Sequence, residues 1–435
     1  MKRLFVFRFC VGVSLAAQLA VANAEDSAAT NAITSTSGVS LEALVADVLQ
    51  HNPELAFYRA EIAAAKGERR TAAAWGNPEF SAQAGQKRVT GNSQADEGLA
   101  WSVSLQQPFE WPGRIPLRKA IANKQVKLAE LGLEQFKAAL VSRARTLGFT
   151  AFAAQQKATA AREVADRFQQ LREVLVQRDP AGLTPVLESR IIEATEVGAH
   201  HKASEQTLAA QSALLELNQI RGQTWTNSLR LAPADFVFRA APEMDVLLNA
   251  TRTNNFELQM RQTELEQQGL RVSLSRNERY PTFSVGPYYS EEKANERERI
   301  IGVGASMPLP LWNRAQGSAE TARARQQQAE TSLFVIQRDV ERRVVDKALT
   351  YQAKLTEMSK WRPDSADEFR KAAELADRHY RLGAVPVSTY VELQEKYLEA
   401  ITALLDTKRE ALEAGQELQT LTGMDFNAVQ VKEAK

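Results

Sequence analysis

The sequence has a single cysteine in 435 residues, Cys10. It lies in an N-terminal stretch that starts with basic residues, continues with a short apolar run and ends in the small-x-small triplet Ala22-Asn23-Ala24. This pattern is typical of a secretory signal peptide over residues 1–24, and the apolar run is too short for a membrane anchor. A mature chain without cysteine would form no disulfide bond and no thiolate metal site.

Long apolar runs and an excess of charge are also missing. Beyond residue 24, no apolar run reaches the roughly 20 residues that a membrane-spanning helix needs. The formal net charge is +1, so no basic excess indicates a nucleic-acid partner. Residues 25–40 are small and polar and predict a flexible leader. We expect an exported protein without a transmembrane helix, located in the periplasm, the outer membrane or outside the cell.

Nine of the 15 prolines fall in four groups: Pro108, Pro112 and Pro116; Pro180 and Pro185; Pro308 and Pro310; Pro363 and Pro386. The intervals between the clusters are rich in good helix formers, and proline is excluded from helix interiors, so the clusters predict helix ends. The interval from Pro116 to Pro180 predicts one helix, or two stacked end to end, about 95 Å long. Apolar residues from Leu333 to Met358 recur at steps of three and four, which predicts a helix-packing seam.

The two halves of the chain repeat. Pro108 and Pro308 are 200 residues apart, as are Arg114 and Arg314. Three further pairs keep the same order at nearly the same offset: NPEL at 52–55 with NFEL at 255–258, NPEF at 77–80 with YPTF at 280–283, and AGLTPV at 181–186 with LGAVPV at 382–387. This indicates an internal duplication. We predict a first repeat over 41–235, a second over 236–424 and a tail over 425–435.

Each repeat also contains two stretches in which apolar residues alternate with Ser, Gln and Gly. They predict β-hairpins at about 79–108 and 282–307, each with one polar face. The patterns therefore predict that each repeat contains a helix, a hairpin, a very long helix, a turn and a long helix, in that order. The turns are expected at about 178–187 and 380–388. The fold class is mainly α with a small β part.

Four strands cannot close a barrel, and an open sheet edge cannot lie in lipid. An apolar face opposite a polar face favours a transmembrane barrel with a wet lumen, closed by several chains. Three chains would supply twelve strands. A small soluble sheet on a helical body, or a plain soluble coiled coil, remains an alternative on pattern alone.

Taken together, these features resemble the TolC-type outer-membrane efflux family from about Leu41 to Met424. The resemblance rests on the duplication, the NPEL and NPEF segments, QPFEWPGR and MPLPLWNRAQG after the hairpins, and the turn RLGAVPVSTYVEL. The Pro-Trp segments most resemble the CzcC-like, cobalt–zinc–cadmium resistance branch. The resemblance implies a homotrimer in the outer membrane of a Gram-negative bacterium, with a twelve-stranded β-barrel continued by an α-helical barrel across the periplasm. It implies a passive duct without cofactor or enzymatic activity, connected by a periplasmic adaptor (membrane fusion) protein to an inner-membrane pump of the RND type.

The resemblance also assigns the turns to the periplasmic tip, where the duct closes. Gly182 and Gly383 match the family's turn glycine. The family's closing latch of Tyr, Arg and two Asp is matched only by Tyr380 and an acid at Glu392, since Val385 and Thr389 stand at the other two positions. The candidates for a tip charge network are Glu188, Arg190, Glu193 and Glu392, and solvated helix charges are the simpler alternative.

The Pro-Trp segments are predicted to be the joints where a barrel strand becomes a periplasmic helix. Proline would end strand pairing and fix φ, tryptophan would lie at the membrane interface, and arginine would open the helix. The joint residues are Pro108, Trp111, Pro112 and Arg114 in the first repeat, and Pro308, Pro310, Trp312 and Arg314 in the second.

Residues with catalytic or metal-binding potential are few. His200 and His201 lie four residues from Glu196 and Glu205, a weak metal-ligand pattern for which a solvated helix face is the simpler explanation. The sequence has no HExxH motif and no glycine-rich phosphate loop. The resemblance to the CzcC-like branch implies a duct for metal cations of the cobalt, zinc, cadmium, nickel and copper class. The alternatives are the same duct for drugs, organic compounds or type I secretion, a periplasmic coiled-coil adaptor and, remotely, an exported enzyme.

Overall fold

A computed structural model describes residues 39–90, 95–178, 186–225, 229, 234–294, 296–312, 315–362, 365–426 and 429–433. The chain divides into two compact units, Met1–Ser37 and Gly38–Lys435, and the description below concerns the second. The predicted signal peptide, most of the predicted leader, Gly182 and Arg314 lie outside the described residues. Among the helices of the described ranges, none is both long and apolar enough to cross a membrane.

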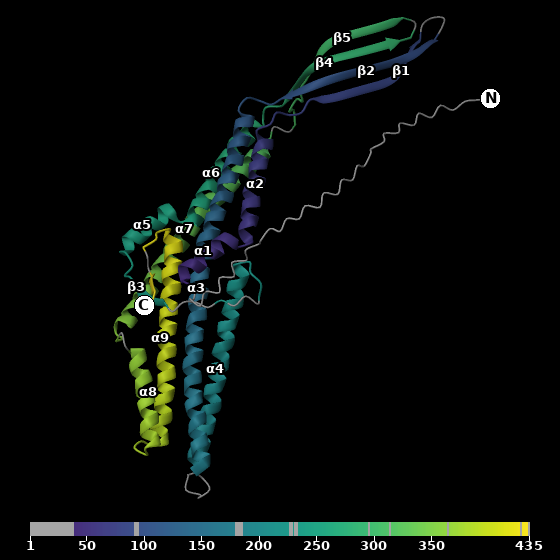
Figure 1. Cartoon of the computed structure of the whole chain (residues 1–435). Helices are drawn as coiled ribbons and strands as arrows, with labels where there is room; N and C mark the ends of the chain where they lie inside the picture. Colours follow the sequence, from purple (N-terminus) through teal and green to yellow (C-terminus); the bar gives the residue numbers. More distant parts are fainter. Residues whose placement is uncertain are drawn as a thin grey trace, which may run out of the picture. The chain divides into compact units, whose positions relative to one another are not determined.

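Both repeats contain two helices, then a hairpin, then long helices, in that order (Figure 1). The first contains α1 (Leu41–His51), α2 (Glu54–Ala72), β1 (Glu79–Thr90), β2 (Ala95–Phe109), α3 (Arg114–Arg178) and α4 (Val186–Ile220). The second contains β3 (Ala234–Phe238), α5 (Met244–Asn254), α6 (Phe256–Asn277), β4 (Phe283–Lys293), β5 (Arg297–Ser306), α7 (Gln316–Ser359), α8 (Ser365–Arg381) and α9 (Val387–Thr422). A last strand, β6 (Val429–Glu433), follows.

The long helices differ between the repeats. In the first, α3 is a single helix of 65 residues, with Pro116 in its first turn, where the missing N–H would have no helical partner. In the second, the corresponding stretch is divided into α7, of 44 residues, and α8, of 17 residues. Pro363 lies in the sequence between them, so the expectation of one very long helix holds only for the first repeat. Each hairpin is also preceded by two helices instead of one.

The four hairpin strands form one antiparallel sheet in the order β1-β2-β4-β5. The central pairing of β2 with β4 joins the two repeats, with Val103 opposite Tyr289 and Phe109 opposite Phe283. Within the described chain, β1 and β5 each have a neighbour on one side only. The predicted fold class, mainly helical with four strands, is confirmed.

A second, two-stranded sheet pairs β3 with β6, with Phe236 opposite Val431. The sequence analysis did not anticipate it: the predicted repeat boundary falls inside β3, and β6 lies in the predicted tail. Both strands have only five residues, too few to show a clear alternation. Their pairing ties the end of the chain to the junction between the repeats.

Buried apolar side chains form separate clusters along the helices. Leu44, Val48, Phe149 and Leu217 belong to one that joins α1, α3 and α4. Val164, Phe168 and Ile192 lie in another with residues of α8 and α9, nearer the α8–α9 turn. A third joins α5, α7 and α9, and it contains Val340 and Val344 of the predicted seam, both fully buried.

Candidate functional site

The four-stranded sheet has two chemically different faces. One face carries Phe80, Trp101, Leu105, Val285, Tyr289, Ile301 and Val303, which the strand register places side by side. Ile301 is 81% exposed and Val303 74% exposed. The opposite face carries Ser81, Gln83, Ser102, Ser104 and Ser290, and the Ser81 and Ser104 hydroxyls lie 2.8 Å apart. An exposed apolar sheet face of this kind suits contact with lipid, and the polar face suits contact with water.

The first joint is held by the guanidinium group of Arg114. It donates hydrogen bonds to the backbone oxygens of Asn277 at 3.1 Å and Tyr280 at 2.7 Å, and to Thr282 Oγ1 at 3.1 Å. Arg114 opens α3, whereas Asn277 ends α6. A cation at the carboxyl end of a helix satisfies free carbonyl groups and is favoured by the helix dipole. The first repeat is thereby bound to the α6–β4 connection of the second.

Aromatic stacking completes this joint. The Trp111 ring stacks on the Tyr280 ring at 4.7 Å between centroids, and Phe109 stacks on Phe283 at 5.5 Å. Asn277 Nδ2 donates to the Pro112 carbonyl oxygen at 3.0 Å. Pro108 does not end the strand as expected, because β2 pairs with β4 through Phe109. Proline at a strand position is tolerated when its missing N–H faces away from the ladder.

Within the described chain, the apolar side chains of the second joint are exposed. Pro308 and Pro310 follow the end of β5, and Trp312 is 93% exposed. Its neighbours Leu309 and Leu311 are 64% and 62% exposed. The two predicted joints therefore differ in this single chain: one packs against the other repeat and one presents apolar side chains outward.

The α8–α9 turn is built around Gly383. Its φ is 74°, and the N–H of Gly383 and of Ala384 donate to the carbonyl oxygens of Tyr380 and His379, both at 2.9 Å. A Cβ at this position would meet no atom within 4 Å. Glycine is therefore favoured here by the left-handed backbone and not by space.

Tyr380, one of the predicted tip residues, stacks on Tyr390 at 5.1 Å with 17° between the rings. The Tyr390 hydroxyl donates to Asp377 Oδ1 at 3.3 Å, and Arg381 Nε donates to Asp377 Oδ2 at 2.8 Å. Burial raises the pKa of Tyr380, and the negative charge of Glu188 raises it further. The structure thus brings Glu188, at the start of α4, near Tyr380, at the end of α8.

Among the described residues, the other predicted tip charges are not joined in one network. Arg190 Nη1 pairs with Glu193 Oε2 at 2.6 Å, but both side chains are largely exposed and only three residues apart. Such pairs contribute little to stability. Glu392 lies on the same helix as Lys396, and its negative charge makes a minor contribution to the raised pKa of the Lys396 amine.

Sequence reasoning missed a buried polar connection among α3, α8 and α9. Gln394 is fully buried, and its amide donates to the Ala373 carbonyl oxygen at 2.8 Å and accepts from Arg167 Nη1 at 3.1 Å. Arg167 also lies 3.6 Å from a Glu374 oxygen. Three helices that are distant in sequence meet here, and the only available signal was a glutamine at an otherwise apolar position.

The histidine pair forms no metal centre in the structure. His201 Nε2 lies 3.4 Å from Glu205 Oε1, and both side chains are more than half exposed. Across the described ranges, no group of three or more His, Cys, Asp or Glu side chains could hold a metal ion.

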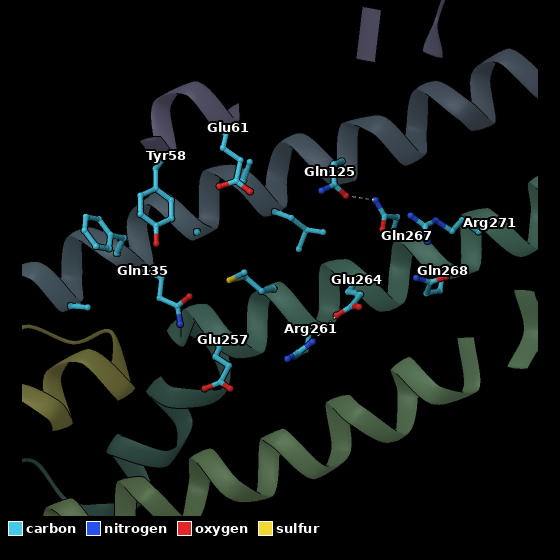
Figure 2. Close-up of a pocket in the computed structure, with 16 residues that line it drawn as sticks. Tyr58, Glu61, Gln125, Gln135, Glu257, Arg261, Glu264, Gln267, Gln268 and Arg271 are labelled. Atoms are coloured by element: carbon cyan, nitrogen blue, oxygen red, sulfur yellow. Dashed lines mark hydrogen bonds and ion pairs between the residues drawn. The ribbon is translucent and has the colours of Figure 1, made fainter. Parts of the chain in front are cut away.

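A groove with a volume of about 870 Å³ lies among α2, α3 and α6 (Figure 2). Its wall is mostly polar: Gln267 Nε2 donates to Gln125 Oε1 at 3.0 Å, and Arg261 Nη1 donates to Glu264 Oε2 at 3.0 Å. The charged side chains of the groove do not converge on one point (Figure 2). The groove offers a wetted helix surface and no catalytic arrangement.

Comparison with known proteins defines the class. Residues 247–424 match the family model described as "Outer membrane efflux protein". The fold is similar to that of CusC (TM-score 0.69, 15% identity, 88% of this chain and 92% of that chain). It is also similar to the CmeC outer membrane channel of Campylobacter jejuni (0.70, 14%, 88% and 85%) and to the MtrE outer membrane channel of Neisseria gonorrhoeae in its open state (0.69, 14%, 88% and 88%). No curated protein sequence matches the chain significantly.

The chain therefore has the fold of outer-membrane channels. Its second repeat carries the sequence signature of the outer membrane efflux family. Proteins of this family and fold are transport ducts and not enzymes.

Proposed function

We propose that the chain is one subunit of an outer-membrane channel that serves as the passive exit duct of a tripartite efflux system. The single observation that carries this proposal is the four-stranded sheet with one apolar face, one polar face and two open edges, placed on long helices in an outer-membrane channel fold. Open strand edges are tolerated in lipid only when a barrel closes. Membrane fractionation with unheated electrophoresis tests it, because a soluble monomer would contradict both the barrel and the function.

The arrangement of the joints supports a homotrimer. The first joint packs on residues 276–282 of the second repeat, and the counterpart of that segment in the first repeat is about 73–79. The exposed second joint, with Leu311 and Trp312, would pack on residues 73–79 of the next copy. Three copies would repeat the same contact six times and close twelve strands.

For the cargo, we favour metal cations of the cobalt, zinc, cadmium, nickel and copper class. The support is the resemblance of the Pro-Trp joints to the CzcC-like branch. Drugs, organic compounds or secreted polypeptides are the second possibility, because a wide wet duct needs little recognition of its cargo. Growth of a deletion strain on these metals and on organic toxicants distinguishes the two kinds of cargo. Sensitivity to organic compounds alone would contradict the metal proposal.

The partners would be a periplasmic adaptor and an inner-membrane RND pump, reached through the tip formed by the α3–α4 and α8–α9 turns. Opening would exchange two packings of these helix pairs. The candidate gating residues are Glu188, Tyr380, Gly383 and Glu392, with Arg190 and Glu193 beside them. Charge reversal at Glu392 and Arg190 should change resting conductance or efflux, and unchanged values in both assays would exclude them from the gate.

A further inference from the structure

The apolar face of the sheet changes character near the hairpin ends. Glu291 lies opposite Trp101 on β2 and opposite Arg299 on β5, so all three share the apolar face. Lys293 and Arg297 form the next pair on this face. The lipid-facing surface of the proposed barrel thus ends in a charged group.

The charged group contains two arginines, Arg297 and Arg299, and both are paired with Glu291. Glu291 is only 12% exposed and forms ion pairs with Arg297 and with Arg299, the latter at 3.4 Å. The Tyr289 hydroxyl donates to Glu291 Oε2 at 2.7 Å. Both guanidinium groups remain more than half exposed. Each has five donor hydrogens, and one shared carboxylate cannot accept from all of them, so donors remain for a further acceptor.

The charge excess is specific to this face. On it, the hairpin ends carry Arg88, Lys293, Arg297 and Arg299 against Glu97 and Glu291, a surplus of two positive charges per chain. On the opposite face, Lys87 pairs with Glu292 at 2.7 Å and with Glu298 at 3.0 Å, and Asp96 also occupies a register position on this face, so the surplus is two negative charges. The positive surplus is therefore on the lipid side alone.

The distance of this charged group from the first joint also matches the height of the apolar band of a transmembrane barrel. Eight residues separate the stacked Phe283 from Glu291, about 26 Å along the strand. At the usual strand tilt this is about 20 Å along the barrel axis, near the far edge of an apolar band about 25 Å tall. Headgroups of the far leaflet would lie at this level.

We propose that Arg297 and Arg299, positioned by Glu291, bind the phosphate groups of phosphorylated lipids in the outer leaflet. Guanidinium groups match phosphate with paired hydrogen bonds, and the surplus charge complements the anionic headgroup. This inference rests on the proposed outer-membrane channel, since it requires the apolar face to contact lipid.

The test uses the purified full-length channel in detergent, titrated with bis-phosphorylated lipid A and with the same lipid after dephosphorylation. We expect the phosphorylated lipid to bind at least tenfold more tightly, and the double variant R297Q/R299Q to lose this preference. The matched control, R323Q/R325Q, removes two exposed arginines from α7 and should keep it. Equal preference in R297Q/R299Q and wild type would overturn the proposal.

Two further measurements separate the remaining explanations. Displacement of the lipid by millimolar inorganic phosphate would show a free-anion site and contradict a lipid site. If R297Q/R299Q does not assemble, R297K/R299K keeps the charge but loses the paired hydrogen bonds, and unchanged affinity in it would overturn the proposal. Failure of the proposed function would be visible earlier, as absence of an oligomer from the outer-membrane fraction before any lipid is added.

Discussion

The side-chain amide of Asn255 donates a hydrogen bond to the carbonyl oxygen of Leu421, near the end of α9, at 2.8 Å. Asn52 makes the same bond to Ile220, at the end of α4, also at 2.8 Å. The side-chain oxygen of each asparagine accepts a backbone N–H at the start of the next helix. The repeated NPEL and NFEL segments thus mark one device, which joins the end of a long helix to the start of a short one.

Replacing Asn255 with alanine should lower the free energy of unfolding by about 2 kcal/mol, because the variant leaves a buried carbonyl oxygen unpaired and removes a helix cap. Thermal melting of the purified protein measures this loss. Asn249→Ala, at an exposed position of α5, is the matched control and should have little effect. Equal melting temperatures for the two variants would show that the hydrogen bond does not stabilise the junction.

Gly383, in the α8–α9 turn, and Gly423, directly after α9, should respond differently to replacement by alanine. Gly383 and Gly423 have φ values of 74° and 61°, so both substitutions cost about 1 kcal/mol of backbone strain. At Gly423, however, the new Cβ would lie 2.7 Å from Asn254 Cβ and 3.0 Å from its carbonyl oxygen, whereas at Gly383 it meets nothing. We expect Gly423→Ala to lower the melting temperature clearly more than Gly383→Ala. The reverse order would contradict the described packing.

Stability at high pH should depend on Tyr351 of α7. Burial raises the pKa of Tyr351 to about 12, and its hydroxyl donates to the Arg239 carbonyl oxygen at 2.6 Å. An unfolded tyrosine ionises near pH 10. The folded state therefore binds more protons between about pH 10 and pH 12, and stability falls as the pH rises through this window. Melting temperatures measured from pH 9 to 12 should fall less steeply in Tyr351→Phe, and identical slopes would exclude this linkage.

The sequence was informative where structure is local and repeated. The prolines around 108–116 and 308–310 marked the strand-to-helix joints, and alternation at 79–108 and 282–307 marked the strands. It was uninformative where structure depends on contacts between distant residues. The Asp377–Tyr390 and Arg167–Gln394 bonds, and the pairing of β3 with β6, join segments whose proximity no local pattern encodes.

The exposed second joint leads to a cross-linking prediction. Leu311 corresponds by the repeat offset to Trp111, and Asn77 corresponds to Tyr280, the residue on which Trp111 stacks. If copies associate as proposed, Leu311 of one copy lies near Asn77 of the next. The double variant Leu311→Cys with Asn77→Cys should then form covalent oligomers on mild oxidation, seen by denaturing electrophoresis without reductant.

We expect no native thiol to compete in the cross-linking, because the only native cysteine, Cys10, lies in the predicted signal peptide. Two control pairs calibrate the result. Trp111→Cys with Tyr280→Cys places both thiols at the joint within one chain and should cross-link without changing the mass. Leu375→Cys with Asn77→Cys combines the same acceptor with an exposed residue of α8 and should stay monomeric under denaturing conditions. Oxidised oligomers from the α8 control but not from the Leu311 pair would show that the second joint contacts something other than the α2–β1 connection of the next copy.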